Sequence, residues 1–112
     1  MPSVHELYDQ ADQLKAEGKL EEAVVKYNEI LDQDNAFSLA HAALAVVQGR
    51  LGQHQKAIDH ARRVCELAPE DPFSHTQLSV IYRRASAGTN NQQYIQDAEE
   101  AMARSRMLKG GM

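Results

Sequence analysis

The chain has 112 residues, of which 43% are hydrophobic and 25% are charged, a balance typical of one ordinary globular domain. Its net charge of −4 and its lack of any run rich in Lys and Arg argue against a nucleic-acid backbone or an anionic membrane as the main partner. Cys65 is the only cysteine, which excludes an internal disulfide and a zinc site built on cysteine pairs.

The first predicted elements are two helices joined by a glycine turn. Ser3 and Glu6 have the spacing of a capping box, which marks the start of a helix. Apolar residues then recur at helical spacing over 7–14, and Gly18 is expected to end the helix in a left-handed conformation. A partner helix is predicted over 20–33.

The second pair of predicted helices repeats this plan. It covers 39–50 and 54–67, and Pro69 follows it because proline cannot continue a helix. The next helix begins at Asp71 and Pro72, a capping residue followed by proline at the first helical position.

The third pair of helices is predicted to contain an insertion. Its first helix is expected over 72–85, and the polar, Gly/Asn-rich segment 86–93 is interpreted as an enlarged turn with about seven extra residues. This segment is expected to form a mobile loop or an irregular extension of its neighbours. A last helix over 92–108 should end at Gly110 and Gly111.

The chain repeats itself at a spacing of 34 residues, and small residues recur where helices would touch. These residues are Ala11, Ala45 and Ser79 in the first helices and Ala23 and Ala57 in the second helices. In the third repeat the equivalent small residue comes seven positions late, at Ala98. Such a period is typical of stacked helical hairpins, here 4–37, 38–71 and 72–108 of one domain over 1–112.

These positions resemble the tetratricopeptide repeat (TPR) family over residues 4–108. The residues that carry the resemblance in the first helices are His41, Leu44, Ala45 and Gln48 in the second repeat and His75, Leu78, Ser79 and Tyr82 in the third. The absence of Trp, the insertion, and Asn35 in place of an exit proline are departures from the family pattern. The resemblance implies an all-α, right-handed superhelical solenoid of three antiparallel helix-turn-helix hairpins.

The resemblance also implies that the first helix of each repeat lines a concave face that binds a peptide or helix of a partner protein. The residues mapped to this face are Tyr8, Asp12, Lys15, Leu39, Ala42, Val46, Arg50, Phe73, Thr76, Val80 and Arg83, with Arg84 nearby. An apolar floor with a basic rim suits a hydrophobic or acidic-hydrophobic segment. The alternative is that the apolar members of this set only pack within a tightly curled superhelix.

The histidines are interpreted as structural or surface residues. His41 and His75 occupy equivalent repeat positions and could approach each other, but two histidines do not make a zinc site. We expect them to be partly buried, each with one satisfied ring nitrogen. His5, His54 and His60 have no partner at helical spacing and are predicted to lie on the surface.

The sequence offers no catalytic candidate. It contains no glycine-rich phosphate loop, HExxH motif or nucleophile elbow, so we expect no enzyme activity, no cofactor and no metal site. Cys65 is predicted to be a small buried hydrophobic residue rather than a reactive thiol. The beginning of the chain has no secretory signal, and no run has membrane-spanning length, so we expect a cytoplasmic protein.

The leading functional hypothesis is therefore a non-catalytic adaptor or scaffold that binds other proteins. The alternative is a self-assembling homo-oligomeric scaffold, because residues 1–37 are acidic and 72–112 are mildly basic. The last hairpin also lacks a separate capping helix. It is predicted to expose Ala98, Met102, Met107 and Leu108, which favours a weak homodimer.

Overall fold

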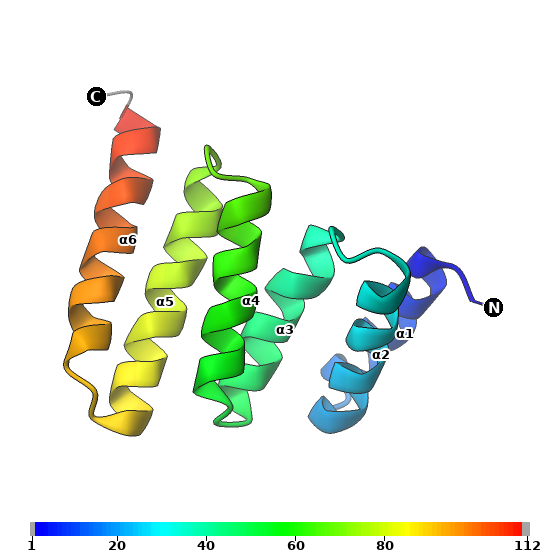
Figure 1. Cartoon of the computed structure of the whole chain (residues 1–112). Coiled ribbons are helices and arrows are strands. Elements are labelled where there is room, and N and C mark those ends of the chain that lie inside the picture. The colour runs from blue at the N-terminus through cyan, green and yellow to red at the C-terminus, as the bar shows by residue number, and fades with distance from the viewer. Residues whose placement is uncertain (1, 111–112) are drawn as a thin grey trace.

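The computed structural model describes residues 2–110, which form six α-helices and contain no strand. The helices are α1 (Val4–Ala16), α2 (Leu20–Gln33), α3 (Ser38–Arg50), α4 (His54–Leu67), α5 (Pro72–Thr89) and α6 (Gln93–Gly110). Consecutive helices pair into three hairpins that stand side by side (Figure 1). The all-α fold is therefore confirmed. None of these six helices has the length and hydropathy needed to cross a membrane.

The predicted start and stop residues lie where the helices begin and end. The hydroxyl of Ser3 accepts the backbone N–H of Glu6 at 3.1 Å, and the carboxylate of Asp71 caps α5 in the same way at 2.9 Å. Gly18 and Gly52 have φ angles of 80° and 78°, which only glycine adopts without strain, so they end α1 and α3. The last helix was predicted to end at Gly110 and Gly111. Helix α6 extends to Gly110, and Gly111 lies outside the described residues.

Helix α3 is buried on almost every side and joins two hydrophobic clusters. Its Leu44 belongs to the cluster that α3 forms with α1 and α2, whereas its Ala45 belongs to the cluster with α4, α5 and α6. A helix that is apolar around its whole circumference has to be covered on several sides. The central position of α3 therefore follows from its sequence.

The repeated small residues are buried between the helices. Ala11, Ala45 and Ser79 are fully buried, and the hydroxyl of Ser79 donates to the backbone carbonyl of Ala98 at 2.8 Å. Ala98 is thus the delayed equivalent of Ala57, as the repeat pattern predicts. The expectation that Ala98 is exposed on the last helix is wrong, because its side chain faces α5.

Of the insertion 86–93, residues 86–89 continue α5 as regular helix and residue 93 begins α6, so the prediction of an enlarged turn is wrong. Both helices of the third hairpin are longer than their counterparts by about one turn, which leaves only 90–92 between them. Seven residues are close to two helical turns, so the insertion lengthens the hairpin without changing which residues face each other. Asn90 ends α5 in the left-handed conformation, with φ 60°. A Cβ added to Gly88 would lie 2.3 Å from Nε2 of His54, so the added turn packs against α4.

Candidate functional site

Helices α3 and α5 present one exposed surface, which we call the α3–α5 face. Its exposed residues are Leu39 and Arg50 from α3 and Phe73, Val80, Arg83 and Arg84 from α5, and the half-buried Ala42 and Val46 of α3 lie between them. Contacts between the two helices hold this surface together. The side-chain amide of Gln77 donates to the backbone carbonyl of Ala42 at 2.9 Å, and the side chain of Arg84 lies against Gly49.

One end of the α3–α5 face is apolar and hollowed. Leu39 and Phe73 are 56% and 71% exposed, and they flank a pocket of 390 Å³. Val80 is 47% exposed further along α5. The alternative that the apolar side chains only pack within a curled superhelix therefore does not hold for Leu39, Phe73 and Val80, whereas Val46 is half-buried. The Nζ atom of Lys109 lies 5.5 Å from the centre of the Phe73 ring, a cation–π contact that covers part of one side of the ring.

The other end of the α3–α5 face is basic. Arg50, Arg83 and Arg84 are exposed, and a Cβ added to Gly49 would lie 3.3 Å from a guanidinium nitrogen of Arg84. The two ion pairs found among residues 2–110 both lie in the first hairpin. None of the three arginines therefore has a carboxylate of the described chain within 4.0 Å. Their charges are free to pair with a ligand.

Tyr8 and Asp12, which were mapped to the same face, serve the packing of the first hairpin instead. The hydroxyl of the fully buried Tyr27 donates to Oδ1 of Asp12 at 2.6 Å, because a buried hydroxyl requires an acceptor. Burial and this carboxylate raise the pKa of Tyr27. The ring of Tyr8 packs against Tyr27 and Phe37, with centroid distances of 6.0 and 5.9 Å. Lys15 is half-buried on the same helix.

Thr76 also points away from the α3–α5 face. Its hydroxyl lies 2.7 Å from that of Ser105 on α6 and donates to the backbone carbonyl of Pro72 at 3.1 Å. Ser105 is buried, so this contact lies inside the third hairpin. The candidate site is thus a two-helix surface in the second and third repeats rather than a three-helix groove.

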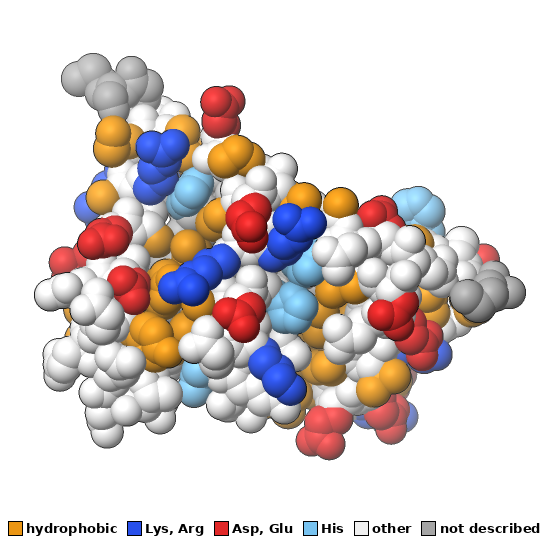
Figure 2. Space-filling view, viewed as in Figure 1, with side chains coloured by type: hydrophobic (Ala, Val, Ile, Leu, Met, Phe, Trp, Pro, Cys, Tyr) orange, Lys and Arg blue, Asp and Glu red, His pale blue; other side chains and the backbone are white. Residues whose placement is uncertain are grey.

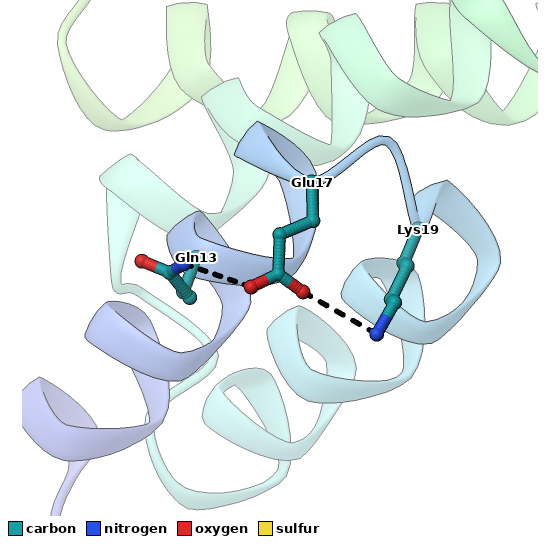
Figure 3. Close-up of polar contacts among 3 residues, drawn as sticks. All are labelled: Gln13, Glu17 and Lys19. Atoms are coloured by element: carbon teal, nitrogen blue, oxygen red, sulfur yellow. Dashed lines mark hydrogen bonds and ion pairs between the residues drawn. The ribbon is translucent and has the colours of Figure 1, made fainter.

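Another hollow lies on the first hairpin, away from the α3–α5 face. It measures 580 Å³ between α1 and α2, and it is lined mainly by Leu14 and by the aliphatic parts of Asp9, Gln10, Gln13, Glu17 and Lys26. Figure 3 shows one part of its rim, where Gln13 donates to Glu17 at 2.8 Å and Nζ of Lys19 lies 3.4 Å from the same carboxylate. The contacts from Gln13 and then Lys19 lower the pKa of Glu17. These groups satisfy one another, as on an ordinary solvated helix surface.

The opposite side of the stack has a different character. In Figures 1 and 2, α2 and α4 lie in front of α1 and α3, and the surface over them carries acidic and basic side chains interspersed. The remaining large exposed apolar residues are Val25 on α2 and Ile95 and Met107 on α6. Single exposed apolar side chains are common on protein surfaces and do not indicate a site.

His41 pairs with His60 and not with its repeat equivalent, His75. Nε2 of His41 donates to the carbonyl of Asn35 at 2.7 Å, which leaves its Nδ1 to accept from Nδ1 of His60 at 2.9 Å. Burial first, and then the proximity of His41, lower the pKa of His60 to about 4. The prediction that His60 lies on the surface is therefore wrong. His75 repeats only the contact to the backbone: its Nε2 lies 2.8 Å from the carbonyl oxygen of Pro69.

Cys65 is half-buried on α4, and its thiol donates to the backbone carbonyl of Ser74 at 3.3 Å. Burial raises the pKa of this thiol, which disfavours the reactive thiolate. Across residues 2–110, no three or more His, Cys, Asp or Glu side chains gather closely enough to hold a metal ion.

Comparisons with known proteins identify the fold. No protein-family model matches the chain, and no curated protein matches it in sequence. Among solved structures, it is similar to the type III secretion translocator chaperone SycD of Yersinia enterocolitica in an alternative dimer, with a TM-score of 0.80 and 17% identity over 96% of this chain and 76% of that one. It is also similar to MamA of MSR-1, with a TM-score of 0.68 and 17% identity over 92% of this chain and 59% of that one. For a double mutant of MamA from RS-1, the TM-score is 0.65 and the identity 16%, over 96% and 76% of the chains. The chain therefore shares the all-α fold of stacked helical hairpins with these proteins.

Proposed function

We propose that this chain is a non-catalytic interaction module whose α3–α5 face binds a peptide segment of a partner protein. The observation that carries the proposal is the exposure of Leu39, Phe73 and Val80 on one surface, next to a 390 Å³ pocket. Water covers these side chains in the isolated chain, and a ligand that replaces the water gains the free energy of apolar burial.

The fold comparisons support the same class of function. SycD is a type III secretion translocator chaperone, and of the three similar structures it has the highest TM-score, 0.80. Stacked helical hairpins provide long surfaces suited to peptides. The α3–α5 face has the two kinds of group that such recognition uses, apolar side chains for affinity and arginines for orientation.

Substitution of Phe73 by alanine tests this proposal. Random peptides of about twelve residues, longer when extended than the face itself, would be selected for binding to the full chain. Phe73→Ala should weaken the selected peptides by about 1–3 kcal/mol, the usual range for an aromatic anchor. Because Phe73 is 71% exposed, the helicity should not change.

Val25→Ala is the matched control, because Val25 is similarly exposed at 57% but lies on α2. Equal losses in both variants, or selected peptides that ignore Phe73, would contradict the proposal. If Phe73→Ala unfolds the chain without any defect specific to binding, Phe73 belongs to the core.

Self-assembly is the second candidate, and α6 is where it would act. Met107 and Ile95 are exposed on this helix, whereas Met102 and Leu108 are half-buried. The rest of the outer surface of α6 is mainly polar and covers the end of the stack. Sedimentation at several concentrations tests this candidate, because an assembly through α6 should weaken in Met107→Glu. A monomer up to high concentration would remove it.

A further inference from the structure

Three rows of chemically matched side chains cross the α3–α5 face. Each row joins a residue of α3 to the residue 34 positions later on α5: Leu39 with Phe73, Val46 with Val80, and Arg50 with Arg84. The equivalent residues of the first repeat are His5, Asp12 and Ala16, which do not continue the rows. The second and third repeats therefore share a surface that is apolar at one end, apolar in the middle and basic at the other end.

The length of these rows sets the size of a ligand that would touch both ends. Phe73 and Arg84 are eleven positions apart on α5, as are Leu39 and Arg50 on α3. At about 1.5 Å per residue, eleven helical positions span roughly 16 Å. An extended peptide advances about 3.3 Å per residue and covers this distance in roughly five residues.

The charges of the face determine the chemistry of the ligand. Arg50, Arg83 and Arg84 have no carboxylate partner within residues 2–110, and an arginine can bind a carboxylate through two parallel hydrogen bonds. The carboxylate near the apolar end, that of Asp71, already caps α5 by accepting the N–H of Phe73. The face thus carries uncompensated positive charge at its basic end.

We infer that the α3–α5 face binds an extended acidic-apolar peptide. An apolar residue of this peptide lies between Leu39 and Phe73. A carboxylate about five residues before or after it is bound by Arg50 and Arg84. This inference rests on the proposed function and adds the composition and spacing of the ligand. Ala42, Val46 and Val80 lie between the two ends and accept small or apolar side chains. The side chain of Arg84 lies close over Gly49, where an added Cβ would come within 3.3 Å of its guanidinium group and would shift it slightly.

Lys109 is a cation at the apolar end, where it lies over the ring of Phe73. A ligand whose carboxylate used Lys109 would need its acidic group next to its apolar residue, not five residues away. The spacing found in selected peptides therefore distinguishes the two ends of the face.

The test is a selection of random peptides of about twelve residues on the full chain. Enriched sequences should pair an apolar residue with Asp or Glu four to six positions away. Adjacent pairs would overturn the inference in favour of Lys109. A spacing near eleven residues would overturn it in favour of a helical ligand, which advances only about 1.5 Å per residue.

The best peptide is then measured against the double variant Arg50→Gln/Arg84→Gln. Its affinity should fall about threefold to tenfold, the range for partly exposed carboxylate pairs, and the remaining affinity should depend less on salt. The matched control is Lys56→Gln/Arg104→Gln, which changes the net charge equally at exposed positions on α4 and α6. Equal losses in both double variants would show a general charge effect and overturn the inference.

The two proposals fail in different ways. Peptides that depend on Phe73 but not on the arginines would leave the proposed function standing and remove only the acidic ligand. Peptides whose affinity is unchanged in Phe73→Ala and in the arginine double variant would contradict both the proposed function and this inference.

Discussion

Replacement of Gly88 by alanine should leave the stability of the chain nearly unchanged, although alanine is the better helix former. In an unobstructed helix this change stabilises by up to about 1 kcal/mol. Here the new Cβ would lie 2.3 Å from Nε2 of His54, far inside the ordinary contact distance. The imidazole ring has to rotate away, and a side chain displaced from its preferred rotamer costs about 0.5–1.5 kcal/mol. The two effects are similar in size and opposite in sign.

A double-mutant cycle separates these effects. With His54→Ala as the background, Gly88→Ala should regain its full stabilisation of about 1 kcal/mol, which gives a coupling energy of about 1 kcal/mol between the two sites. Urea denaturation followed by far-ultraviolet circular dichroism measures all four variants, and the chain's lack of Trp makes this the natural signal. If Gly88→Ala stabilises the chain fully with His54 present, the inserted turn does not pack against α4, and the description of the third hairpin is wrong.

Two further substitutions test the buried polar contacts. Tyr27→Phe should cost about 1–2 kcal/mol in the free energy of unfolding, because Asp12 loses its hydrogen bond at 2.6 Å; an unchanged denaturation midpoint would mean that water replaces the hydroxyl without loss. His60 has its pKa lowered from 6.5 to about 4, so the unfolded chain binds a proton in this window before the folded chain does. The free energy of unfolding should therefore fall by about 1–2 kcal/mol as the pH drops from 6.5 to 4, a figure reduced for the partial exposure of the ring. In His60→Gln, this part of the pH profile of stability should be flatter. An identical slope in the variant would assign the loss to other groups.

Much of the fold can be read from local signals in the sequence. Capping residues such as Ser3 and Asp71 and the glycine at position 18 fix helix ends through nearby backbone groups, so their positions do not depend on the rest of the fold. The repeat spacing then pairs the helices and places Ala98 against Ser79. The insertion was misinterpreted because its Gly and Asn residues are typical of turns. A helix satisfies its own backbone hydrogen bonds, however, and two additional turns fit an antiparallel pair without changing its register.

The candidate site was harder to predict because repeat position does not reveal which side chains are used by packing. Asp12 is the repeat equivalent of Val46, but its carboxylate accepts a hydrogen bond from the hydroxyl of Tyr27. The second repeat has Ala61 at the position of Tyr27 and therefore has no such hydrogen bond. A tyrosine on the buried side of α2 requires a hydrogen-bond acceptor, and Asp12 on the adjacent helix could supply it; this requirement could have been recognised from the sequence. The partner of His60 lies 19 residues away on another helix, beyond the reach of any spacing rule for a single helix.

We expect the α3–α5 face to be the surface with which this chain binds its partner. Backbone-amide NMR spectra, recorded while a selected peptide is added to the full chain, test it most directly. The largest shift changes should fall on α3 and α5, at Leu39, Val46, Phe73 and Val80, with little change on α2 or on the outer surface of α6. Changes concentrated on α2, α4 or α6, with α3 and α5 unaffected, would contradict the claim.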